Sequence, residues 1–124
     1  MNSNHEKRIV AVVDDLFFAT KIRQTARQTG VWVDFATTEE GVLGLAANKP
    51  SLIIVDLNIN SFNPLALISR LKGDPELKQI SLLGFVSHVQ GELKLQAQKA
   101  GCDAVVARSS LSQNLPQILK RHSG

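Results

Sequence analysis

The 124-residue sequence is informative first in what it lacks. It has a single cysteine, Cys102, so no disulfide can form within the chain, and a reducing compartment such as the cytoplasm is expected. No apolar run approaches the length that crosses a membrane. The short apolar stretch near the start meets Asp14 and Asp15 too soon to act as a signal peptide. We therefore expect a cytoplasmic protein without a membrane partner.

The chain also lacks the dense basic run and the interleaved aromatic residues that typify nucleic-acid surfaces. Its net charge is +3, but Lys21, Arg23 and Arg27 cluster only loosely. We interpret these as solvated charges and expect no direct contact with nucleic acid. The hydrophobic content of 44% and the charged content of 20% are ordinary globular values, which exclude a disordered or coiled-coil chain.

Apolar runs alternate with helix-like segments along the whole chain. Strands are predicted over residues 8–13, 31–35, 52–56, 80–86 and 104–107. Helices are predicted after each strand, and the first of them covers about residues 17–29. Five such units predict a parallel sheet with right-handed crossovers and helices on both faces. We expect one domain over residues 1–124, with a core from about 7 to 121 and no output domain.

Capping residues predict where these helices begin and end. Thr37 with Glu40 has the capping-box pattern, and Ser110 with Gln113 is expected to open the last helix. Asn63 followed by Pro64 is typical of an N-cap and a first helical residue. The C-caps are expected at Gly30 and Gly101.

Polar side chains follow four of the predicted strands. They are Asp14 and Asp15 after the first, Asp56 at the end of the third, Ser87 after the fourth and Arg108 after the fifth. Ligands of parallel α/β sheets bind at the carboxyl ends of the strands, so these groups should converge. Three carboxylates repel one another and need a cation, for which Mg²⁺ is well suited. Asp56 is then the candidate nucleophile for a phosphoryl group, with Ser87 and Arg108 contacting the phosphoryl oxygens.

At these residues the sequence resembles the receiver domains of bacterial two-component response regulators. The resemblance runs from about Lys7 to Arg121 and is carried by VVDD at 12–15, LIIVDLN at 52–58, LKGDPELKQISLLGFVS at 71–87 and AGCDAVVARS at 100–109. It implies a flavodoxin-like (βα)5 three-layer sandwich with strand order 2-1-3-4-5. It also implies that Mg²⁺ is held by Asp14, Asp15, Asp56 and the backbone carbonyl of Asn58. Asp56 is then the phosphoacceptor, assisted by Ser87 and Arg108.

The same resemblance implies particular partners. A sensor histidine kinase or a phosphotransfer protein would donate the phosphoryl group to Asp56. The domain would then signal by docking onto a downstream protein target, and pairing into a homodimer is a further expectation. No enzymatic activity is expected beyond self-phosphorylation and dephosphorylation on Asp56.

Several positions depart from the family pattern. Arg108 stands where lysine is usual, Ser109 where proline is usual, and Val105 where a switching aromatic residue is usual. These departures favour a second hypothesis, a degenerate receiver that binds a protein partner without phosphate. His88 is expected to be a polar surface residue. Phe17 is expected to be packed or partly buried, the alternative being an exposed apolar contact surface beside the acids.

Enzymes of similar architecture are disfavoured by missing motifs. The segment DDLFFAT after the first strand lacks the hydroxyl- and glycine-rich loop of a flavodoxin and the glycine-rich turn of a dinucleotide-binding fold. A dehalogenase-type phosphatase would need an acid two residues beyond its nucleophile, where this chain has Asn58.

Overall fold

Five parallel strands alternate with five helices in the computed structural model, which describes residues 8–87 and 91–123. The strands are β1 (Ile9–Val12), β2 (Val33–Ala36), β3 (Leu52–Asp56), β4 (Ser81–Val86) and β5 (Ala104–Ala107). The helices are α1 (Leu16–Thr29), α2 (Glu39–Ala46), α3 (Pro64–Gly73), α4 (Gly91–Ala100) and α5 (Arg108–His122). The strand order is β2-β1-β3-β4-β5, which confirms the predicted flavodoxin-like (βα)5 fold.

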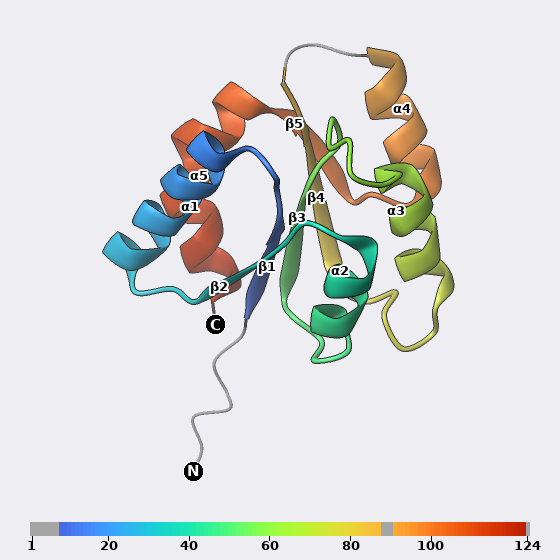
Figure 1. Ribbon diagram of the computed structural model, residues 1–124, viewed down its shortest axis with the longest axis horizontal. Coiled ribbons are helices and arrows are strands. Elements are labelled where there is room, and N and C mark those ends of the chain that lie inside the picture. Colours follow the sequence, from blue (N-terminus) through green and yellow to red (C-terminus); the bar gives the residue numbers. More distant parts are fainter. Residues whose placement is uncertain (1–7, 88–90, 124) are drawn as a thin grey trace.

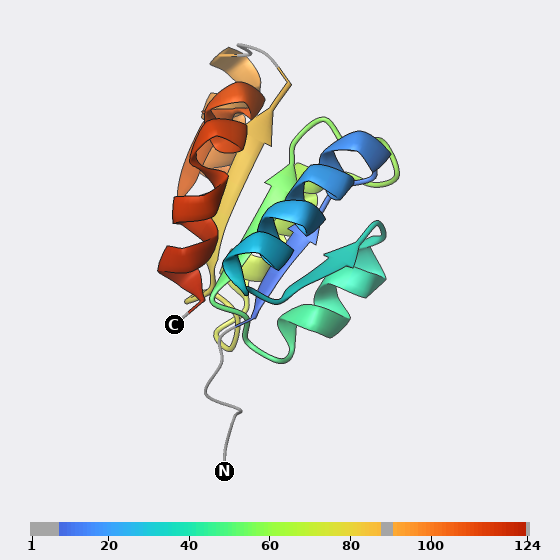
Figure 2. The same ribbon diagram turned by 90° about the vertical axis from the view of Figure 1, so that its left-hand side faces the viewer.

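Helices cover both faces of the sheet. Figure 1 shows α1 and α5 on one side and α2, α3 and α4 on the other, and Figure 2 shows α1 and α5 lying over the same face. Each face has its own hydrophobic core, so alternate residues of β1, such as Ile9 and Val10, belong to different cores. Both β1 and β3 are buried at every residue, which explains why neither strand alternates apolar with polar residues. No helix in the described ranges is long and apolar enough to cross a membrane.

Three of the predicted helix caps are found in the structure. The side chain of Asn63 accepts hydrogen bonds from the backbone N–H groups of Leu65 and Ala66, which confirms it as the N-cap of α3. Gly30 and Gly101 end α1 and α4 with positive φ angles of 72° and 117°, as expected of glycine caps.

Two predicted helix starts are wrong by one or two residues. The N-cap of α2 is Thr38 rather than Thr37, since the Thr38 hydroxyl accepts from the N–H of Gly41 at 3.0 Å. The last helix begins at Arg108 rather than near Ser110, and no side chain caps it. Because β5 passes directly into α5, there is no loop in which a serine cap could lie. This early start places Arg108 in the first turn of α5, at the sheet edge that carries the acids.

Candidate functional site

Asp56 is the buried acid of the site. It is the last residue of β3 and is only 4% exposed. Its Oδ1 accepts a hydrogen bond of 2.8 Å from the backbone N–H of Asn58. Burial raises the pKa of Asp56 above its ordinary value, because a charged carboxylate loses hydration there. The negative charges of Asp14 and Asp15 add to this shift, while the Asn58 N–H and the charge of Arg108 oppose it.

Asp15 caps α1 and pairs with Arg108 at the same time. Its Oδ1 accepts from the backbone N–H groups of Phe17 and Phe18, at 2.9 and 3.3 Å. Its Oδ2 accepts from Nη1 of Arg108 at 2.8 Å, and this hydrogen bond lowers the pKa of Asp15. Both carboxylate oxygens of Asp15 are therefore engaged. The neighbouring Asp14 is exposed.

Arg108 lies between the two acids. While Nη1 bonds Asp15, Nη2 lies 4.0 Å from Oδ2 of Asp56. The guanidinium carbon is 5.0 Å from the ring centroid of Phe18 and 5.8 Å from that of Phe85, both within cation–π range. Nε of Arg108 is buried and makes no hydrogen bond within the described part of the chain. These aromatic contacts were not anticipated, because Phe18, Phe85 and Arg108 lie far apart in the sequence.

Ser87 and Asn58 connect the loops that follow β4 and β3. Both the hydroxyl and the backbone N–H of Ser87 donate to Oδ1 of Asn58, at 2.9 Å each. The family resemblance implied a role for the backbone carbonyl of Asn58, but not this role for its side chain. A polar residue two positions beyond a strand gives no sequence signal for such a bond. Here the predicted phosphate-contacting hydroxyl is held by an amide oxygen of the chain.

The predicted site residues therefore gather at one edge of the sheet, where a guanidinium lies beside two of the acids. Within residues 8–87 and 91–123, no three acidic, histidine or cysteine side chains are placed to hold a metal ion. The guanidinium of Arg108 lies 2.8 Å from Asp15 and 4.0 Å from Asp56. Both carboxylate oxygens of Asp15 are engaged within the chain, so a divalent cation held by Asp14, Asp15, Asp56 and Asn58 would have to compete with Arg108, and Mg²⁺ at these residues remains a prediction from sequence.

The aromatic residues after the acid pair behave differently from each other. Phe18 is buried against Phe85, with ring centroids 5.0 Å apart. Phe17 was expected to be packed or partly buried, and this is wrong, because it is 91% exposed. Successive helical residues point about 100° apart, so the turn that buries Phe18 turns Phe17 outward. The atypical Val105 is buried, Ser109 is exposed, and His88 lies outside the described residues.

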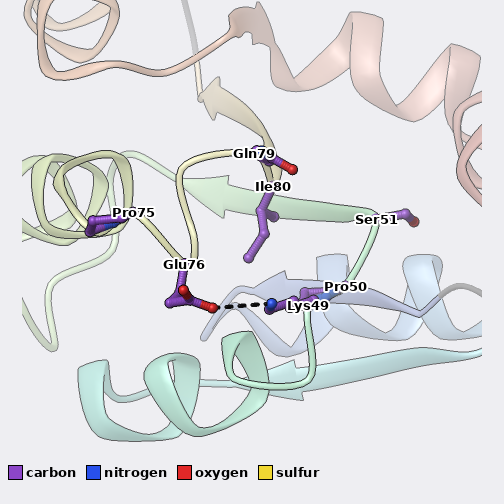
Figure 3. A pocket seen from close by; sticks show the side chains of 7 residues that line it. All are labelled: Lys49, Pro50, Ser51, Pro75, Glu76, Gln79 and Ile80. Carbon is purple, nitrogen blue, oxygen red and sulfur yellow. Dashed lines mark hydrogen bonds and ion pairs between the residues drawn. The ribbon is translucent and has the colours of Figure 1, made fainter.

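A cavity of about 390 Å³ lies at the opposite, amino-terminal edge of the sheet (Figure 3). Its lining residues are Lys49, Pro50, Ser51, Pro75, Glu76, Gln79 and Ile80. Lys49 and Glu76 form an ion pair of 3.3 Å across it, and both side chains are largely exposed. None of the predicted site residues lines this cavity.

Comparison with known proteins supports the fold. No protein-family model and no curated protein sequence matches the chain. Solved structures do match, including the chemotaxis protein CheY4 of Vibrio cholerae, at 18% identity over 94% of this chain and 98% of that one, with a TM-score of 0.79. The receiver domain of a signal transduction histidine kinase from Syntrophus aciditrophicus matches at 22% identity, 93% and 88% coverage and a TM-score of 0.78.

A third solved structure is a response regulator protein from Burkholderia pseudomallei with a phosphorylated aspartic acid, a calcium ion and citrate. It is 24% identical over 91% of this chain and 66% of that one, with a TM-score of 0.76. Similarity at these identities establishes the fold. The chain thus has the receiver-domain fold, and the resemblance found in its sequence is confirmed at that level.

Proposed function

We propose that this chain is a receiver domain of two-component signalling that accepts a phosphoryl group on Asp56. The observation that carries the proposal is the position of Asp56, a buried carboxylate at the carboxyl end of β3, with Arg108 4.0 Å away. A structure of the same fold carries a phosphorylated aspartic acid, which supports this chemistry.

The geometry suggests which atom reacts. Oδ1 of Asp56 is tied to the N–H of Asn58, so Oδ2, on the side of Arg108, is the oxygen available to attack phosphorus. A bond forms from Oδ2 to phosphorus, the bond from phosphorus to the donor breaks, and the leaving group takes its electron pair. Arg108 would neutralise charge on the transferred oxygens. Ser87 could donate to one of them once its hydroxyl leaves Asn58.

The proposed donor is a sensor histidine kinase or a phosphotransfer protein, and the proposed output is binding to a downstream protein target in the cytoplasm. Within this proposal the chain is not an enzyme beyond its own phosphorylation and dephosphorylation. Direct binding to nucleic acid is not proposed. A homodimer is one form that the output could take.

A second candidate function is a phosphorylation-independent protein-binding module. Two observations favour it: Arg108 already pairs with Asp15, and Asn58 already holds the Ser87 hydroxyl. Because Arg108 and the Ser87 hydroxyl are already paired within the chain, the site can keep this arrangement without a phosphoryl group. Such a module would bind its partner equally well with and without a phosphate mimic.

Intact mass after incubation with acetyl phosphate and Mg²⁺ tests the first function. We expect one labile phosphoryl adduct on the wild type and none on Asp56→Asn. Asp103→Asn is the matched control, since Asp103 pairs with Lys72, away from the site, and this variant should still be labelled. An adduct that persists in Asp56→Asn contradicts the assigned acceptor. No adduct, together with no binding of beryllofluoride, favours the binding module.

A further inference from the structure

The acid site already contains a positive charge supplied by the chain itself. Arg108 bonds Asp15 at 2.8 Å and lies 4.0 Å from Asp56, so one guanidinium faces two of the three acids. Such a cation balances the repulsion between these carboxylates. The chain therefore provides internally what a cluster of three acids otherwise takes from solution.

The surroundings of Arg108 suit arginine in particular. Its guanidinium lies over Phe18 and Phe85, whose rings are tilted by 51° to each other. A planar guanidinium can stack on aromatic faces while its two terminal nitrogens point to different acceptors, and a lysine ammonium cannot do both. Both phenylalanines are buried, which makes this a rigid seat for the cation. We call Phe18 and Phe85 the aromatic seat.

A divalent ion at this site would need oxygens that are now engaged. Oδ1 of Asp15 caps α1, and Oδ2 of Asp15 accepts from Arg108. To free Oδ2, the Arg108 side chain must leave Asp15. It has a route to do so, because the Arg108 side chain is 32% exposed and can extend into solvent.

We propose that Arg108 is the resident counter-ion of the acid site and competes with divalent cations for Asp15 and Asp56. Metal binding and arginine pairing then exclude each other, and the site admits a cation from solution only when Arg108 leaves the aromatic seat. This inference concerns the same acids as the proposed function, but it does not require that phosphoryl transfer takes place.

Binding of Mn²⁺ to the purified chain, followed by electron paramagnetic resonance of the free ion, tests the proposal. The main variant is Arg108→Met, which keeps an apolar stem against the aromatic seat while it removes the charge. We expect it to bind Mn²⁺ about fivefold more tightly than the wild type, the upper end of the effect expected when a competing, partly exposed ion pair is removed. Arg108→Lys, which keeps the charge without the fork, should fall between the two and serves as the second variant should Arg108→Met fold poorly.

Two controls place the effect at this site. Arg70→Met removes an arginine that pairs with Glu39 at 3.0 Å on the surface, and it should leave Mn²⁺ affinity unchanged. The affinity gained by Arg108→Met should be lost again when Asp56→Asn is added. Wild type and Arg108→Met binding with equal affinity would overturn the proposal, as would absence of binding in a folded Arg108→Met. Failure of phosphoryl transfer appears only in the mass assay, so the two proposals can fail separately.

Discussion

Replacing Asp56 with asparagine should make the folded chain more stable at neutral pH. The asparagine has nearly the same shape, and its side-chain oxygen can still accept from the N–H of Asn58. What disappears is a negative charge on a residue that is 4% exposed and close to two other carboxylates. The substitution also removes the attraction between Asp56 and Arg108, but their closest nitrogen–oxygen distance of 4.0 Å is beyond hydrogen-bond length, so little is lost.

The expected gain in free energy of unfolding is about 1 kcal/mol, or roughly a fivefold shift in the folded-to-unfolded ratio. Desolvation is the first cause of the raised pKa of Asp56, so relief of desolvation is the larger effect. The gain must depend on pH. Below the ordinary pKa near 3.8, Asp56 is protonated in both the folded and the unfolded chain, and the variant has no advantage. As the pH rises from the ordinary pKa to the raised native pKa, the wild type alone comes to bury a charge, so the advantage grows over this interval and is complete above the native pKa.

Urea unfolding of both proteins at about pH 7 and pH 4 measures this difference. Asp103→Asn is the control, because Asp103 accepts from Lys72 at 2.9 Å and from the N–H of Leu82 at 2.8 Å. We expect that control to lose up to about 1 kcal/mol. An Asp56→Asn variant less stable than the wild type at neutral pH would refute the reasoning, since it would mean that the site stabilises the charge of Asp56 more than burial penalises it.

Three further predictions concern one loop residue and two glycines. Asn58→Ala should lower the free energy of unfolding by about 1 kcal/mol and speed amide exchange at Ser87, which loses its acceptor; unchanged exchange would argue against that bond. Gly101→Ala should cost about 2 kcal/mol in thermal or urea unfolding, because φ is +117° and the new Cβ would lie 2.7 Å from Cγ of Lys72. Gly44→Ala, inside α2 with open space around its Cβ, should instead stabilise the chain by about 0.5 kcal/mol, and a loss there would contradict the same reasoning.

The strands and their positions along the chain could be predicted because they depend on local patterns, whereas their order in the sheet was implied by the family resemblance. Uninterrupted apolar runs predict strands buried on both faces, and the run at 52–56 coincides with β3, which is buried at every residue. In a parallel sheet all carboxyl ends lie at one edge, so the convergence of Asp15, Asp56, Ser87 and Arg108 followed from topology alone. The helix starts could not be predicted to the residue, since Thr37 and Thr38 can both cap a helix and only the path of the chain selects one.

Tertiary structure alone decided how the polar side chains pair. Arg108 reaches Asp15 across 93 positions of sequence, and Ser87 reaches Asn58 across 29. The helical phase of α1 buried Phe18 beneath the guanidinium and exposed Phe17. The sequence by itself determined which chemical groups meet at this edge, because hydrophobic periodicity sets the sheet. Which oxygen each cation and hydroxyl contacts depends on strand register, side-chain rotamers and neighbouring rings, and these exist only in the folded chain.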